Sequence, residues 1–205
     1  GSMIRHVERL KLAELALFMP QSSLFGIDDE YLSAQTAIIA DMAHYHFDEF
    51  ITDADRKYPD TLMLAMLLDG HDEKMIESGM RYGSCVSSGV QFARHWVDMP
   101  PEYSSPLQLA TKAQEVADRH GFKCTLFTED EVVQMVMGGL SGVARGSERD
   151  CQLVVMEYAC GDEQAPTLGF VGKGITFDSG GLSIKPADSM ETMKDDMAGA
   201  AAVLG

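Results

Sequence analysis

The chain has 205 residues, and 45% of them are hydrophobic, which suffices for the core of one large domain or two small ones. Its formal net charge of −16 argues against broad nucleic-acid binding, which needs a basic surface, and no apolar run is long enough to span a membrane. Four cysteines without a CxxC pair, and no recognisable secretory signal, indicate reduced thiols and a cytoplasmic location.

Residues 4–70 predict a small N-terminal α/β domain. A short helix precedes a strand over residues 15–19, and apolar residues at helical spacing over residues 31–45 predict an amphipathic helix. A continuous apolar run at residues 62–68 is typical of a buried strand. Helices and strands that alternate in this way indicate packed α and β layers.

The amphipathic helix carries His44 and His46, with Asp48 just beyond them. Residues two apart on a helix do not share a face. The pattern therefore favours a solvated or packed histidine pair over a metal site.

Residues 71–97 predict one long helix, because apolar residues recur along them at helical spacing and Pro100 and Pro101 follow. This helix would link the N-terminal domain to a second domain over residues 98–205. Trp96, the only tryptophan, is interpreted as a packing residue.

The second domain is expected to be the first part of a catalytic domain with a mainly parallel sheet. Helices capped by Ser105 and Thr128 would run to Gly121 and to Gly138. Strands are expected over residues 122–126, 153–158 and 167–171. The βαβ order indicates parallel pairing, so Lys173 would lie at the carboxyl end of a strand, where ligands bind in such sheets.

The candidate chemistry lies in the last stretch of the chain, VGKGITFDSGGLSIKPADSMETMKDDMAGAAAVLG. Its methionines and alanines recur at spacings of three and four, so one amphipathic helix is expected. Asp188 and Glu191 would form its capping box, and Asp196 would lie beside the apolar stripe.

Two lysines and two aspartates of this stretch could form a metal site. Carboxylates bind hard or borderline divalent ions, and a lysine amine does so only when its pKa falls well below ~10.4. A second, charged lysine would suit a developing oxyanion. Composition alone favours a simpler interpretation, a glycine-rich turn with solvated charges.

Two other motifs are disfavoured. Gly172, Lys173 and Gly174 lack the GxxxxGK[ST] spacing of a phosphate-binding loop. Ser179 lacks the GxSxG context of a serine nucleophile.

Three motifs, VGKGITFDSGG, SIKP and MKDDMAGAAAV, stand in the order and at the spacings of the leucyl aminopeptidase family, the two-metal M17 peptidases. The chain resembles this family from about Gly89 to Gly205. The bacterial peptidase B type is one candidate subgroup, and the motifs do not separate it from the others. The resemblance implies a metal-dependent aminopeptidase that releases N-terminal residues, with a leucine-type preference, from peptides with a free N terminus.

The resemblance also implies roles for four residues. Lys173, as a neutral amine, and Asp196 would ligate the tighter of two divalent ions, and Asp178 would contact both. Lys185 would be catalytic, because it would bind the substrate carbonyl and stabilise the tetrahedral intermediate. The ions would be Zn²⁺ or Mn²⁺, with Mg²⁺ or Co²⁺ as alternatives. Full-length members commonly form hexamers, and neither nucleic acid nor a membrane is an expected partner.

The family also has a later NTDAEGR-type segment that supplies an Asp, a Glu and an Arg, and this sequence contains none. The second metal site is therefore expected to be incomplete. Two functions stay open from the sequence. One is a leucyl-type metallo-aminopeptidase, and the other is a truncated, catalytically incomplete fragment that acts only as a folded or interaction module.

Overall fold

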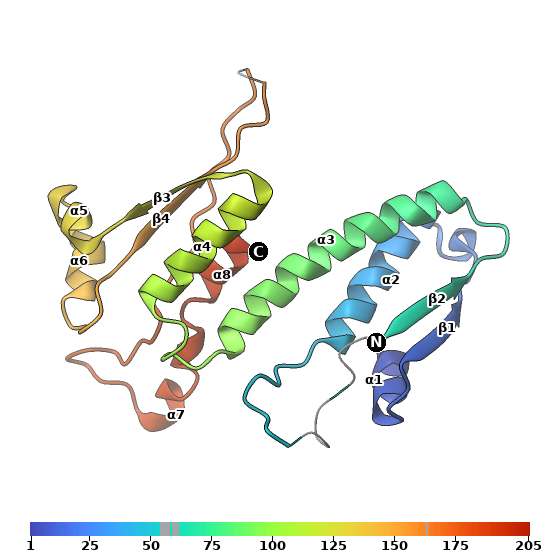
Figure 1. The fold of residues 1–205 in the computed structure, drawn as a ribbon, viewed down its shortest axis with the longest axis horizontal. Coiled ribbons are helices and arrows are strands. Elements are labelled where there is room, and N and C mark those ends of the chain that lie inside the picture. Colours follow the sequence, from blue (N-terminus) through green and yellow to red (C-terminus); the bar gives the residue numbers. More distant parts are fainter. Residues whose placement is uncertain (54–57, 59–61, 163) are drawn as a thin grey trace. The chain divides into compact units, whose positions relative to one another are not determined.

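The computed structural model describes residues 1–53, 58, 62–162 and 164–205 and divides into two compact units (Figure 1). Unit 1 covers residues 1–92 and unit 2 covers residues 93–205. The mixed α/β class expected from the sequence is confirmed. The finer division into residues 4–70, 71–97 and 98–205 remains a prediction.

Unit 1 contains a two-stranded parallel sheet and its helices. In chain order its elements are α1 (Ser2–Arg9), β1 (Glu14–Phe18), the 3₁₀ turn η1 (Ser22–Phe25), α2 (Asp29–His44), β2 (Met63–Leu67) and most of α3 (Glu73–Asp98). Glu14 lies opposite Met63, and Phe18 lies opposite Leu67. The bounds of these elements agree with the expected ones to within a few residues, but β2, which was expected to be a buried strand, alternates exposed and half-buried residues. The Asp28 carboxylate caps α2 by accepting the Tyr31 N–H at 2.7 Å.

Helices α2 and α3 pack closely because two glycines of α3 face the backbone of α2. A Cβ on Gly79 would lie 2.0 Å from the Glu30 carbonyl oxygen, and a Cβ on Gly83 would lie 2.5 Å from the Ala34 carbonyl oxygen. Ala34 and Ala37 are buried on the facing side of α2. Any larger side chain at the two glycines would push the helices apart.

The first charged contact of unit 1 joins His71 to Asp29. The His71 side chain is fully buried; its Nδ1 lies 2.8 Å from Asp29 Oδ1, and its Nε2 lies 3.3 Å from the Met19 carbonyl oxygen. Because both ring nitrogens face acceptors, the imidazolium form satisfies both. The Asp29 hydrogen bond raises the pKa of His71. Hydrogen bonds from Ser22, His71 and Asp72 lower the pKa of Asp29 to about 2.

A second polar contact joins α1 to the end of α2. It corrects the premise that His44 and His46 both lie on one helix. Because α2 ends at His44, the chain beyond it turns, and both imidazoles reach Glu8. Glu8 Oε1 lies 2.6 Å from His44 Nδ1 and 3.2 Å from His46 Nε2. The Glu8 side chain is buried, and the His46 ring stacks on Tyr58.

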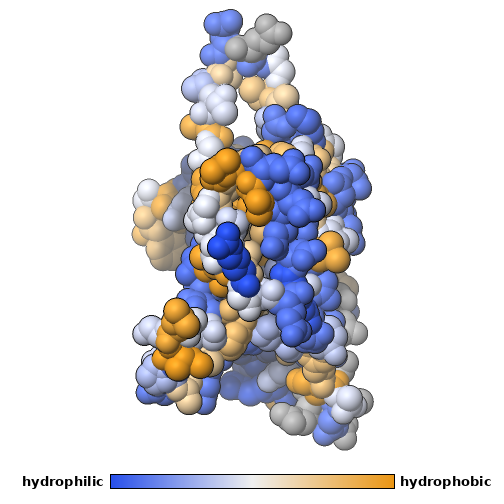
Figure 2. Space-filling view, turned by 90° about the vertical axis from the view of Figure 1, so that its left-hand side faces the viewer, coloured by the Kyte–Doolittle hydropathy of each residue, from blue (hydrophilic) through white to orange (hydrophobic). Residues whose placement is uncertain are grey.

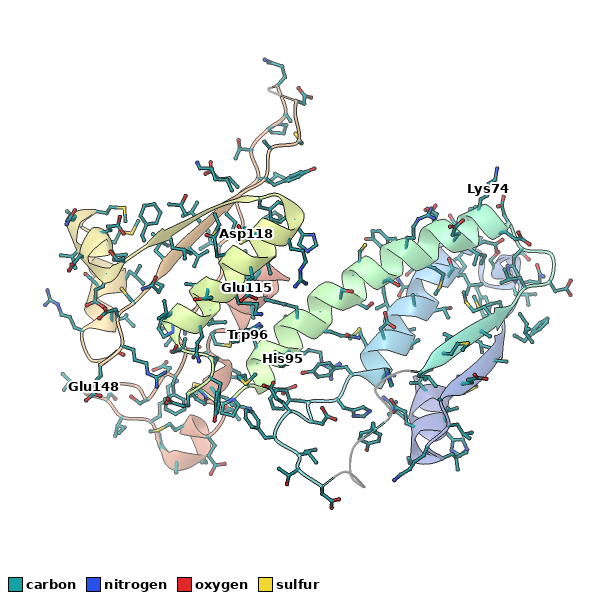
Figure 3. All side chains as sticks on the ribbon, viewed as in Figure 1. Lys74, His95, Trp96, Glu115, Asp118 and Glu148 are labelled. Atoms are coloured by element: carbon teal, nitrogen blue, oxygen red, sulfur yellow. The ribbon has the colours of Figure 1, made fainter. Side chains whose placement is uncertain are left out.

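Unit 2 begins within the last turns of α3. Its further elements are α4 (Pro106–His120), β3 (Lys123–Phe127), α5 (Glu129–Gln134), α6 (Gly138–Ala144), β4 (Leu153–Glu157), α7 (Ala187–Met190), the 3₁₀ turn η3 (Met193–Asp195) and α8 (Ala198–Leu204). The expected caps are confirmed, since Ser105 and Thr128 each form a capping box. Trp96, in the last turn of α3, is buried as expected of a packing residue (Figure 3).

The sheet of unit 2 corrects the expected parallel pairing, because β3 and β4 are antiparallel. Phe127, at the end of β3, lies opposite Leu153, at the start of β4. A parallel connection needs a helix that carries the chain back along the whole strand. The intervening helices α5 and α6 are short and lie at one end of the sheet (Figure 1), so the chain re-enters from the end at which it left.

Two boundaries also differ from expectation. Residues 167–171 form no strand, because no described strand pairs with them, and Leu168, Phe170 and Val171 are exposed. The helix that begins after Thr128 ends at Gln134, and Gly138 starts a new helix. Val136 adopts a left-handed conformation between them, which interrupts the helical geometry.

Exposed hydrophobic residues occur on α5 and α6, including Val133 and Val143. Figure 2 faces the side of unit 2 that carries these helices and shows hydrophobic groups interrupted by hydrophilic ones. Such scattered groups do not by themselves identify a binding surface. In the part of the chain that the structure describes, no helix combines the length and hydrophobicity that a bilayer span needs.

The glycine contacts predict that Gly83→Ala destabilises the protein. The new Cβ would clash with the Ala34 carbonyl, at an overpacking cost of about 1–3 kcal/mol in the free energy of unfolding. Gly142→Ala in α6 is the matched control, because nothing lies within 4 Å of its Cβ position. Urea unfolding should show a loss for the first variant and no loss for the second. Equal stability of both variants would contradict the packing described for α2 and α3.

The Asp29–His71 pair predicts a window of maximal stability in pH. Because the folded pKa of His71 is raised above 6.5, its contribution is complete below pH 6.5 and is lost as the pH rises through the raised pKa. Because the folded pKa of Asp29 is about 2, its contribution is complete above pH 3.8 and is lost as the pH falls toward 2.

Urea titrations of the wild type and of His71→Gln between pH 3 and 9 test this window. The difference in stability between the two proteins should be largest between about pH 4 and 6.5 and should shrink above that range. A difference that stays constant up to pH 9 would show that the charge on His71 does not contribute.

Candidate metal and catalytic site

The segment that carries Lys173 packs directly against the start of α8. The Ala200 N–H donates to the Lys173 carbonyl oxygen at 2.8 Å, and a Cβ on Gly172 would lie 2.4 Å from the Gly199 carbonyl oxygen. Only a residue without a side chain permits this approach. Helix α8 therefore positions Lys173. The expectation that Lys173 ends a strand is wrong, since residues 166–175 form none.

Asp196 lies in a break between short helices, which corrects the expected single helix. The Met193 carbonyl oxygen accepts the Asp196 N–H at 3.5 Å, in 3₁₀ geometry, and the Asp178 N–H at 3.4 Å. This bond to a distant segment, together with the 3₁₀ geometry, replaces the regular α-helical pattern between α7 and α8.

The predicted apolar stripe and the predicted capping box of this helix have different outcomes. Met197 is buried, as the predicted stripe of Met190, Met193, Met197, Ala200 and Leu204 requires, but the other four are only half-buried, and the buried alanine is Ala201. The capping box of Asp188 and Glu191 is absent, because α7 has Pro186 at its N-cap and no side-chain cap.

The four residues singled out in the sequence form two ion pairs in this region. Lys173 Nζ lies 2.7 Å from Asp196 Oδ1, and Lys185 Nζ lies 3.0 Å from Asp178 Oδ2. Asp178 and Asp196 also share the Met193 carbonyl as acceptor for their N–H groups. In each pair a lysine faces an aspartate, and the Met193 carbonyl links the two pairs.

A tight turn returns Lys185 to Asp178. Gly180 has φ +90°, which L side chains rarely adopt, and its N–H donates to Asp178 Oδ1 at 2.9 Å. The Lys185 N–H donates to the Ser179 carbonyl at 2.9 Å and closes the turn. A Cβ on Gly180 would lie 2.4 Å from the Ser183 carbonyl oxygen, so glycine is required there both by conformation and by space.

Each ion pair shifts the pKa of one of its members, Lys173 in the first pair and Asp178 in the second. The hydrogen bond to Asp196 is the main cause that raises the pKa of Lys173, and the charges of Asp196 and Asp178 add to it. The hydrogen bond from Lys185 is the main cause that lowers the pKa of Asp178, followed by the Gly180 N–H. A neutral Lys173, as the resemblance implies for a metal ligand, requires that the metal displace this proton.

The donor atoms fit a divalent cation. Asp196 Oδ2 is buried and has no hydrogen-bond partner among the described residues, a status it shares with Glu8 Oε2 of unit 1. Such an unpaired carboxylate oxygen is costly unless a cation satisfies it. Carboxylate oxygens with one amine suit ions such as Mn²⁺ or Zn²⁺. Within the described ranges, no three His, Cys, Asp or Glu side chains are arranged to hold a metal, so the donor set depends on Lys173.

The structure adds two neighbours that sequence reasoning did not single out for the site. Met193 Sδ lies 2.7 Å from Lys185 Nζ, and Lys194 Nζ donates to the Asp98 carbonyl oxygen at 2.5 Å. Met193 was interpreted only as part of an apolar stripe. Asp98 lies 96 residues from Lys194, so no local spacing could have revealed that contact.

Known proteins resemble the domain that carries these four residues. The model described as "Cytosol aminopeptidase family, catalytic domain" matches residues 91–205, which is more than half of the chain. A "probable cytosol aminopeptidase" of Acidobacterium capsulatum is 37% identical over 206 residues, covering 100% of this chain and 40% of that protein. One of Geobacter sulfurreducens is 41% identical over 165 residues, covering 80% of this chain and 33% of that protein.

A solved structure has the same fold. The bottromycin maturation enzyme BotP in complex with Mn superposes with a TM-score of 0.83 at 27% identity, covering 99% of this chain and 41% of that chain. The chain spans between 33% and 41% of the length of these relatives. The matched domain, the relatives and the shared fold together show that this chain belongs to the cytosol aminopeptidase family, the M17 peptidases.

Proposed function

We propose that the chain supplies metal ligands and a catalytic lysine to a metal-dependent aminopeptidase, which releases the first residue of peptides with a free N terminus. One observation carries the proposal: Lys173, Asp178, Lys185 and Asp196 form two ion pairs that meet at the Met193 backbone, and Asp196 keeps a buried oxygen without a partner.

The metal would be held by the Lys173 amine and by the carboxylates of Asp178 and Asp196. When bound, a divalent ion supplies Lewis acidity and an activated water for hydrolysis. Mn²⁺ is the first ion to test, because BotP was solved with Mn. These three residues supply enough donors for one well-bound ion.

Lys185 would act on the substrate. Its ammonium group is held between Asp178 Oδ2 and Met193 Sδ, and about a quarter of its side chain is exposed (28%). A charged donor fixed in this way suits the oxyanion that develops when the peptide carbonyl is attacked. The Gly180 turn keeps it in place.

The finer features of the proposal rest on the family resemblance. They are two divalent ions, with Zn²⁺, Mg²⁺ or Co²⁺ as alternatives to Mn²⁺, a leucine-type preference, a cytoplasmic location and a homo-oligomer that is hexameric at full length. The alternative function is a folded module without turnover. The described residues provide two carboxylates and one amine, which suffice for one ion but not for a second, and this favours the alternative.

The donor set predicts one well-bound Mn²⁺ per chain. Calorimetric titration should give a stoichiometry near one, and Asp196→Asn should weaken binding by about tenfold or more, because it removes a charged ligand. Asp118→Asn, on the exposed face of α4 (Figure 3), is the matched control and should bind like the wild type. Two tight sites, or equal affinity in both variants, would contradict the proposed ligands.

The role of Lys185 predicts a loss of turnover in Lys185→Ala. Release of p-nitroaniline from leucine p-nitroanilide with Mn²⁺ should fall by about 10²-fold or more, with KM little changed, because the lysine acts on the transition state. Lys112→Ala, a partly exposed lysine of α4, should retain the wild-type rate. If the Mn²⁺-loaded wild type releases no more than Lys185→Ala, the module without turnover is the better description.

A further inference from the structure

Lys194 lies between the candidate metal ligands and the end of the longest helix. It belongs to η3, next to Met193 and two residues before Asp196. Its side chain leaves this turn and donates from Nζ to the carbonyl oxygen of Asp98, the last residue of α3. Both residues belong to unit 2, so the contact lies within one compact body.

The contact satisfies a general need of helix ends. The last carbonyl groups of an α-helix have no intrahelical donor, and they carry the negative end of the helix dipole. A lysine ammonium that reaches such a carbonyl supplies both a donor and a positive charge. Helix α3 is long, and its last turn is anchored by the buried Trp96 (Figure 3). The end of α3 is therefore a well-packed site to which the Lys194 side chain can bind.

The turn held by Lys194 also places both carboxylates. The neighbouring Met193 carbonyl accepts the N–H groups of Asp178 and Asp196, at 3.4 and 3.5 Å. Both bonds are long, so by themselves they fix the turn only weakly. A shift of η3 would move the adjoining Asp196 and would break or lengthen the bond from the Asp178 N–H to Met193. The additional hydrogen bond from Lys194 to Asp98 can therefore fix the position of η3 relative to the rest of unit 2.

We propose that Lys194 is a positioning residue for the metal site. It does not touch the metal or the substrate. By binding the end of α3, it holds η3 so that Asp178 and Asp196 present their oxygens to one ion. The expected effect on metal affinity rests on the proposed function. The anchoring of η3 by Lys194 does not depend on it.

The first test measures the anchoring without a metal. Amide hydrogen exchange at Asp178 and Asp196 should become about five- to tenfold faster in Lys194→Met, because a charged hydrogen bond is lost. Exchange at Thr125 in β3 should not change, because this strand lies away from η3 in the sequence and pairs with β4. Lys194→Arg should restore slow exchange, since arginine keeps the charge and the donors.

The second test measures the consequence. Mn²⁺ affinity by calorimetry should fall about five- to tenfold in Lys194→Met, return in Lys194→Arg, and stay at the wild-type value in the control Lys112→Met. Circular dichroism should show the same folded signal in every variant. If Lys194→Met does not fold, Lys194→Gln, which keeps a donor without the charge, replaces it and should show an intermediate loss.

The two tests separate the inference from the proposed function. If exchange accelerates but the wild type binds no Mn²⁺, the anchoring stands and the proposed metal site fails. If the wild type binds Mn²⁺ but Lys194→Met changes neither exchange nor affinity, the inference is overturned and the proposed function stands.

Discussion

The site of this chain depends on the close approach of residues 172–173 to the first turn of α8. Without a side chain at Gly172, the two backbones come near enough for the Ala200 N–H to bind the Lys173 carbonyl. That bond sets the Lys173 amine opposite Asp196, which precedes α8 by two residues. Backbone packing therefore brings the two residues side by side, and the Lys173 side chain, which is 56% exposed, reaches the largely buried Asp196 carboxylate from there.

The second pair is fixed by a different means. The left-handed Gly180 and the bond from the Lys185 N–H to Ser179 close a turn that brings Lys185 back to Asp178. The Met193 carbonyl then joins this turn to the segment that carries Asp196. Two short-range constraints and one longer-range bond thus create a cluster in which each carboxylate faces a lysine. Such a cluster keeps its charges balanced until a cation competes for the carboxylates.

Unit 1 shows the same reliance on small residues and on buried charge. Gly79 and Gly83 let α3 lie against α2, where alanines would force the helices apart. The buried His71 and Glu8 each meet an oppositely charged or hydrogen-bonding partner from a distant segment. These contacts favour the observed packing of the helices, because moving the segments apart would break them.

The sequence by itself determined the family and most helices, and it nominated the four candidate residues, because motif spacing, capping residues and apolar periodicity are local properties. Predictions from the sequence were wrong where hydrogen bonds between distant segments decide the backbone structure. The Met193 carbonyl accepts the Asp178 N–H and divides the expected helix, the short α5 and α6 make β3 and β4 antiparallel, and residues 167–171 find no strand to pair with. Only the tertiary structure could decide these points, and only it could place Lys194 on the end of α3, since hydrogen bonds between remote residues leave no periodic trace in the sequence.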